Sequence, residues 1–183
     1  MLIEFIDTPV VRFNGNPACR MIQDRYYKLV ASAALFLSVV FPDRNPLLNF
    51  GDACPRSGSC PNHPDGAHPF KGTAIDGDYP TLSGCNTTQY RVISKGPLDK
   101  IWMDDKLVIS NFDWERTYIF WRVLSLGCPT LRIDTHQAIY DFMLPMIGRK
   151  YGMGEVQWFK KYVFADSSRV FNHKTHFHLR FEK

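Results

Sequence analysis

The C-terminal stretch His173-Lys-Thr-His-Phe-His-Leu-Arg180 is the part of the sequence that decides the fold. Apolar and polar side chains alternate along it, which predicts a β-strand over about 175–182 with one face toward a core. Residues two apart in a strand point to the same face, so His176 and His178 are expected side by side. One of these imidazoles can bind a metal ion while the other faces a substrate.

A second block, His68-Pro-Phe-Lys-Gly-Thr-Ala-Ile-Asp76, adds the other donors of a candidate metal site. In it a histidine is followed by a glycine turn and by an aspartate at the end of an apolar stretch. Five of the six histidines fall in two short segments, namely His63 and His68, then His173, His176 and His178. Two imidazoles and one carboxylate suit catalytic zinc, because three protein ligands leave the fourth tetrahedral position open for water.

The chain of 183 residues fits one domain, with N-terminal strands and a buried helix in 1–49 and a metal-site core in 50–183. We expect an α+β fold in which helices pack against a small antiparallel sheet that carries the zinc site. The expected strands are 2–5, 9–13, 73–76, 90–94, 131–133 and 175–182, with a hairpin at 101–110. The expected helices are 21–41, 114–126 after an N-cap at Asp113, and one from an N-cap at Asp134 to about 150, whereas 43–70 reads as a long loop and 155–165 is ambiguous.

The amino-acid composition limits the classes of molecule that the protein is expected to bind. The residues are 45% apolar and 14% aromatic, as in a globular protein, and the net charge of +4 favours an anionic partner. Basic residues are scattered rather than clustered, which argues against nucleic acid. The longest apolar run, Leu29 to Phe41, is too short to span a bilayer and reads as a buried helix. Met1 to Asp7 shows no clear secretory signal.

The five cysteines leave at least one free thiol. Cys54 and Cys60 are close enough in sequence for a disulfide. A zinc site of these two with His63 is the other interpretation, although the spacing is not that of a zinc knuckle.

The sequence also resembles a known family of zinc peptidases, which includes lysostaphin, the D-Ala-D-Ala peptidases and the hedgehog signalling domain. Within that group it is most similar to the penicillin-insensitive murein endopeptidases. The resemblance covers about 50 to 183 and rests on five segments: Gly51-Asp52, Pro61-Asn-His63 with His68, Gly72 and Asp76, Asn111-Phe-Asp-Trp-Glu-Arg116, Leu131-Arg-Ile-Asp134, and His173 to Arg180.

The resemblance implies a Zn²⁺-dependent hydrolase that cuts peptide cross-links in bacterial peptidoglycan as an endopeptidase. It makes His68, Asp76 and His178 the metal ligands and His176 the general base or the group that stabilises the oxyanion. His63 and His173 would contact the ligands or the substrate. Asp113 could orient substrate, although a helix N-cap explains it equally well.

Two alternatives stay open. A D,D-carboxypeptidase or dipeptidase would use the same metal, with Lys71 or Arg180 holding a terminal carboxylate. A non-catalytic zinc-containing binding domain would have His176 pointing away from the metal, or a protein group in the fourth coordination position. We expect a monomer that acts at the bacterial cell wall, whether periplasmic, secreted or delivered by a phage as an endolysin.

Overall fold

The computed structural model describes residues 1–15, 19–53, 72–82, 112–166 and 176–181, and it confirms the α+β class. Four helices lie in this part of the chain: α1 (Asp24–Val40), α5 (Trp114–Gly127), α6 (Gln137–Tyr151) and α7 (Met153–Tyr162). The strands are β1 (Leu2–Glu4), β2 (Val11–Phe13), β3 (Met21–Gln23), β4 (Leu48–Phe50), β5 (Ala74–Asp78), β6 (Arg132–His136), β7 (Val163–Asp166) and β8 (His176–Arg180).

Six of these strands form one mixed sheet in the order β2-β4-β5-β8-β6-β7, and β1 pairs with β3 in a small antiparallel ribbon. The C-terminal strand β8 lies in the middle, antiparallel to both β5 and β6. The outer pairs β2–β4 and β6–β7 are parallel. A strand from the chain terminus therefore joins two halves of the sheet that come from distant parts of the sequence.

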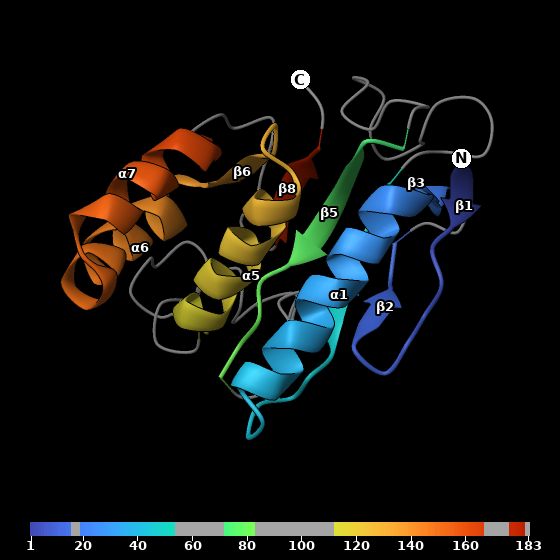
Figure 1. The fold of residues 1–183 in the computed structure, drawn as a ribbon, viewed down its shortest axis with the longest axis horizontal. Helices are drawn as coiled ribbons and strands as arrows, with labels where there is room; N and C mark the ends of the chain where they lie inside the picture. Colours follow the sequence, from blue (N-terminus) through green and yellow to red (C-terminus); the bar gives the residue numbers. More distant parts are fainter. Residues whose placement is uncertain (16–18, 54–71, 83–111, 167–175, 182–183) are drawn as a thin grey trace, which may run out of the picture.

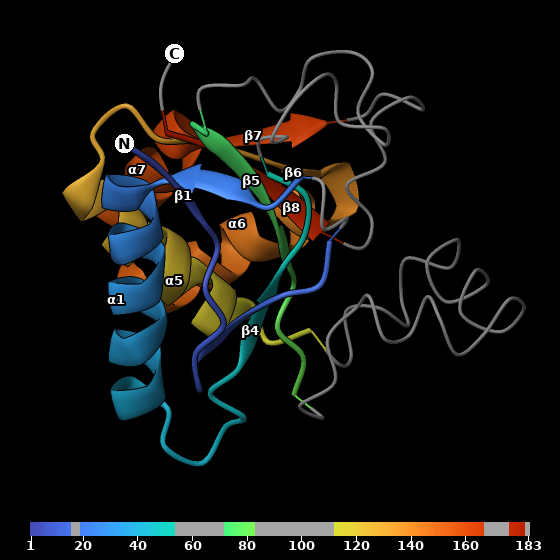
Figure 2. The same ribbon diagram turned by 90° about the vertical axis from the view of Figure 1, so that its right-hand side faces the viewer.

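The helices cover one face of this sheet (Figures 1 and 2). Helices α1 and α5 pack against each other across the middle strands, and α6 and α7 lie beside β6 and β7. Phe177 of β8 is the centre of the contact, with its ring 5.3 Å from that of Trp121 and 6.2 Å from that of Phe120. Full burial of such a side chain contributes roughly 1.5–3 kcal/mol, so this face holds the main core.

Helix α5 begins as the sequence predicts. The Asp113 carboxylate accepts the Arg116 backbone N–H at 3.3 Å, which satisfies one of the amides that the first turn leaves without an intrahelical partner. The helix continues until Gly127, and Trp121 and Leu124 are fully buried on its inner side. The expectation of a capped helix after Asp113 is confirmed.

Three local expectations are wrong. The stretch from Asp134 does not begin a helix, because β6 continues to His136 and pairs with both β7 and β8, so neither residue lies in α6. Helix α1 starts at Asp24, since 21–23 pair with β1 instead. The expected loop 43–70 contains β4, which joins β2 to β5. In each case strand pairing between distant segments overrides the local signal.

The ambiguous segment 155–165 divides into the end of α7 and the start of β7. The expected strand 90–94, the hairpin 101–110 and the Cys54 and Cys60 pair lie outside the described residues. Cys19 is disulfide-bonded, whereas Cys128 is a buried free thiol that donates to the Phe181 carbonyl at 3.1 Å. Within the described part of the chain, no helix is long and apolar enough to cross a membrane.

Candidate active site

The face of the sheet opposite the helices, called the open face below, carries charged and imidazole side chains along its three middle strands. Ile75, Ile133 and Leu179 point into the core, so their neighbours in sequence point to the other side. The open face is defined by Asp76 and Asp78 of β5, His176, His178 and Arg180 of β8, and Arg132, Asp134 and His136 of β6. Packing alone does not require such a set.

Asp76 and His178 meet on this face. They are direct partners in the register of β5 and β8. The Asp76 Oδ1 atom lies 2.8 Å from the His178 Nδ1 atom, and the two residues are 6% and 2% exposed. Because buried polar groups are costly unless they are hydrogen-bonded, this contact holds both side chains in place.

The end of β4 fixes the backbone beside Asp76. The Gly51 N–H donates to the Asp76 carbonyl at 2.9 Å, and the Asp76 N–H donates to the Asp52 carbonyl at 3.0 Å. A Cβ atom on Gly51 would lie 3.2 Å from the Cβ of Asp76, closer than most such contacts. A glycine at 51 therefore allows β4 to approach the aspartate, which gives Gly51-Asp52 a physical role at the site.

His176 lies two residues before His178 on the same strand and is the cross-strand partner of Asp78. Its Nε2 atom is 4.0 Å from the Asp76 Oδ2 atom, and its side chain is 24% exposed. His176 thus approaches the same carboxylate as His178 but remains accessible to solvent. This accessibility is what a group that exchanges protons with a substrate needs.

Tyr79 ties this end of β5 to β6. Its hydroxyl lies 2.6 Å from the Thr135 Oγ1 atom and accepts the His136 backbone N–H at 3.4 Å. Burial raises the pKa of Tyr79 above its ordinary value, so the phenol is neutral near pH 7. The contact fixes the spacing of the strands that flank β8.

The donor chemistry of Asp76 and His178 fits zinc. Two ligand atoms at tetrahedral zinc lie about 3.3 Å apart, which follows from metal–ligand distances of about 2.0–2.1 Å. The separation of 2.8 Å between Asp76 Oδ1 and His178 Nδ1 is that of a direct hydrogen bond and is about 0.5 Å shorter than this value. The pair therefore offers one oxygen and one nitrogen donor that already converge.

The structure brings together three of the six predicted site residues, namely Asp76, His176 and His178. His63, His68 and His173 lie outside the described residues. Within the part that is described, no three His, Cys, Asp or Glu side chains are arranged to hold a metal ion. A complete three-ligand set would need a donor from elsewhere in the chain, which is the role predicted for His68.

Sequence reasoning missed Asp134, which it placed at a helix N-terminus. Asp134 is the partner of His178 in the register of β6 and β8, so it lies on the other side of His178 from Asp76. It is buried, and its carboxylate binds Arg132 Nε at 2.8 Å and Arg180 Nε at 3.1 Å. The signal was available in Arg132-Ile-Asp-Thr-His136, where polar and core residues alternate as in β8.

A comparison of the sequence with models of known protein families gives no match, and a comparison with curated proteins also finds no significant similarity.

Proposed function

We propose that this protein is a zinc-dependent peptidase that hydrolyses peptide cross-links in bacterial peptidoglycan. The observation that carries the proposal is the contact between Asp76 and His178. These residues are 102 positions apart, were selected from the sequence as ligands of one metal, and are 2.8 Å apart on adjacent strands. The proximity of His176 to the same carboxylate supports a catalytic rather than a purely structural site.

Each residue has a distinct role in this proposal. Asp76 and His178 hold the metal together with His68. Zinc bound there would act as a Lewis acid toward a carbonyl oxygen and would lower the pKa of water. The Nε2 atom of neutral His176 accepts a proton from the attacking water and returns one to the leaving amine. The alternative role of His176, as a donor to the oxyanion, uses the same position.

The burial of the site supports this division of roles. Asp76 and His178 are almost fully removed from solvent, which fixes their orientation, whereas His176 is partly exposed. The net charge of +4 suits an anionic, wall-bound polymer. Action at the bacterial cell wall, as a monomer, completes the proposal.

One observation favours exopeptidase action as a second candidate. Arg180 lies on the open face two residues after His178, and a guanidinium group can pair with the terminal carboxylate of a peptide. A D,D-carboxypeptidase would release single residues from stem peptides, whereas an endopeptidase would convert cross-linked dimers into monomers. Analysis of the products from purified cross-linked muropeptides distinguishes the two.

The experiment pairs zinc content with digestion of bacterial sacculi for the wild type, His178→Ala, His176→Ala and Arg12→Gln. The wild type should hold about one zinc per chain and release peptides. His178→Ala should lose both properties, and His176→Ala should keep zinc but lose activity by about 10²-fold or more. Arg12→Gln, at an exposed residue of the edge strand β2, is the control and should keep both.

Three other outcomes would contradict parts of the proposal. A wild-type protein that binds zinc but releases nothing from sacculi or soluble stem peptides is a zinc-containing binding domain. If the wild type binds no zinc, the metal site is wrong. If His176→Ala digests sacculi at the wild-type rate, the general base is another group.

A further inference from the structure

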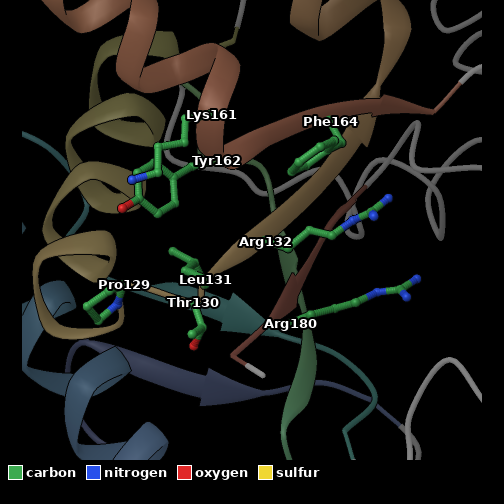
Figure 3. Close-up of a pocket in the computed structure, with 8 residues that line it drawn as sticks. All are labelled: Pro129, Thr130, Leu131, Arg132, Lys161, Tyr162, Phe164 and Arg180. Carbon is green, nitrogen blue, oxygen red and sulfur yellow. The ribbon is translucent and has the colours of Figure 1, made fainter. Parts of the chain in front are cut away.

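A pocket of about 510 Å³ lies beside the candidate site, between the end of α7 and strands β6, β7 and β8 (Figure 3). Eight described residues line it: Pro129, Thr130, Leu131, Arg132, Lys161, Tyr162, Phe164 and Arg180. Three of them are cationic and none is acidic. The composition of this lining favours an anionic ligand.

Arg132 and Arg180 form the part of the lining nearest to the candidate site. They are direct partners in the register of β6 and β8, and Figure 3 shows them side by side, extending in the same direction. Like charges directly opposite each other destabilise a sheet. Asp134 offsets this repulsion, because its Oδ1 atom accepts a hydrogen bond from Arg132 Nε at 2.8 Å and its Oδ2 atom lies within ion-pair distance of Arg180 Nε, at 3.1 Å.

Asp134 also orients the arginine pair. Each guanidinium has five N–H donors, and both arginines approach Asp134 through Nε, so Asp134 does not use the four donors of the terminal nitrogens. The guanidinium carbon of Arg132 lies 4.4 Å from the centre of the Phe164 ring, a cation–π contact that restrains the side chain. The arginine side chains are 46% and 44% exposed, so a ligand can reach them.

The charge balance remains positive after Asp134 is counted. Arg132 and Arg180 contribute two positive charges and Asp134 one negative charge, while Lys161 adds a further positive charge on the opposite side of the pocket. Two oriented guanidinium groups with net positive charge match the two oxygens of a carboxylate.

We propose that Arg132 and Arg180, oriented by Asp134, bind a carboxylate of the substrate. The identity of that substrate as a peptidoglycan stem peptide rests on the function proposed above. Arg180 is two residues from His178, or about 6.6 Å along the strand, which an extended peptide spans with about two residues. The bound carboxylate therefore lies within about two residues of the bond that is cut.

The test measures binding rather than turnover. The full-length His176→Ala protein is titrated calorimetrically with N-acetyl-D-Ala-D-Ala, which has one carboxylate, and with the same peptide as its carboxamide. The acid should bind about tenfold more tightly than the amide, because it alone forms charge-assisted hydrogen bonds with the pair. Adding Arg132→Gln or Arg180→Gln should reduce this preference to less than about twofold.

Arg12→Gln is the matched control. Arg12 is an exposed arginine of β2, an edge strand of the same sheet, and its substitution changes the net charge by the same amount. It should leave the preference for the acid intact. Arg180→Lys keeps the charge but not the planar fork, so it should retain part of the preference. Thermal unfolding of each variant shows that the fold is kept.

Several results would overturn the proposal. One is equal affinity for acid and amide in the parent protein, and another is a loss in Arg12→Gln as large as that in Arg180→Gln. Inorganic phosphate that binds at the pair about tenfold more tightly than the acid would reassign the pair to phosphate. None of these binding measurements requires zinc or hydrolysis. The test can therefore be interpreted even if the protein proves not to be a peptidase.

Discussion

The two faces of the middle strands differ in what their side chains do, although the same five-residue segments supply both. In β8, Phe177 and Leu179 are buried against the helices, while His176, His178 and Arg180 point to the open face. Aromatic packing accounts for the first set. It does not account for the second, which includes an imidazole that is 2% exposed.

Stability alone would favour apolar residues on both faces. Removing Asp76, Asp134 and His178 from water is costly, and well-packed apolar residues in place of buried charged groups are often neutral or stabilising. Each of these groups instead has a partner across the sheet, Asp76 and His178 in each other and Asp134 in Arg180. Packing therefore explains the residues of the helix-covered face, whereas the residues of the open face are explained by a need for specific donor atoms. This difference supports a functional role for the open face.

The helical layer also contains polar contacts, but their geometry suggests a different role. Tyr118 donates to Glu155 at 2.7 Å, and Arg122 binds the same carboxylate at 3.0 Å, so this cluster ties α5 to α7. Such contacts join elements to one another at the edge of the core. They should affect stability and leave zinc binding and hydrolysis unchanged.

The largest effect on stability is expected from Phe177→Ala on the helix-covered face. Loss of a buried ring that contacts Trp121 and Phe120 should lower the free energy of unfolding by about 3–5 kcal/mol. Urea unfolding measures it. The control is Phe36→Ala on the exposed side of α1, which should change stability by less than about 1 kcal/mol. Equal losses would mean that the helix-covered face is not the main core.

The next largest effect separates structure from function on the open face. Asp76→Ala removes the acceptor of the 2.8 Å bond to His178 and should cost about 1–3 kcal/mol in metal-free protein. The double variant Asp76→Val/His178→Phe replaces both partners by apolar groups and should lie within about 1 kcal/mol of the wild type. Both variants should lose zinc.

Urea unfolding of chelator-treated protein measures the free energies of unfolding. Titration with zinc measures the metal affinity. If the double variant loses as much stability as Asp76→Ala or more, the pair is part of the structural framework. The contrast between the two faces would then disappear.

The sequence allowed prediction of those parts of the fold in which the local signal and the long-range pairing agree. In β8 the alternation of imidazoles with Phe177 and Leu179 is strong enough to predict both the strand and its two faces. Asp113 is followed by an apolar pattern of helical period, and the helix begins there. The convergence of Asp76 with His178 was predicted from motif and resemblance, since no periodicity brings together residues 102 positions apart.

The errors arise where the two kinds of signal conflict. Asp134 precedes a run that reads as a helix, so the local pattern favours an N-cap. Pairing of β6 with β7 and β8 extends the strand by three residues beyond Ile133 and moves Asp134 to the open face. The arginine pair was missed for the same reason, because Arg132 and Arg180 become neighbours only when β6 and β8 are paired. Such pairing is a tertiary property that the local sequence does not contain.

A smaller effect tests whether Asp113 belongs to the helical layer alone. Asp113→Ala removes the N-cap of α5 and should lower stability by about 1 kcal/mol, whereas Asp113→Asn retains a capping oxygen and should lower it by less. Urea unfolding and sacculus digestion are measured on both variants. If Asp113→Asn keeps stability but loses hydrolysis, Asp113 also contacts substrate, as the resemblance implies.

The smallest effect is a pH dependence at the edge of the helical layer. Partial burial acts to raise the pKa of Glu115, but hydrogen bonds from Lys150 and Tyr151 outweigh it and hold the pKa below its ordinary value of 4.5. A carboxyl group whose pKa is lower in the folded protein stabilises the fold above its unfolded pKa, and this contribution is lost as the pH falls through the folded pKa. The difference in unfolding free energy between the wild type and Glu115→Gln should therefore be constant from about pH 7 to about pH 5 and shrink below the ordinary pKa. Because the group is partly exposed, the difference should stay under about 1 kcal/mol.

Asp43→Asn, at an exposed carboxylate, is the control. A difference that grows as the pH falls would show that Glu115 is held in its protonated form, and the ion pair would then not join α5 to α6.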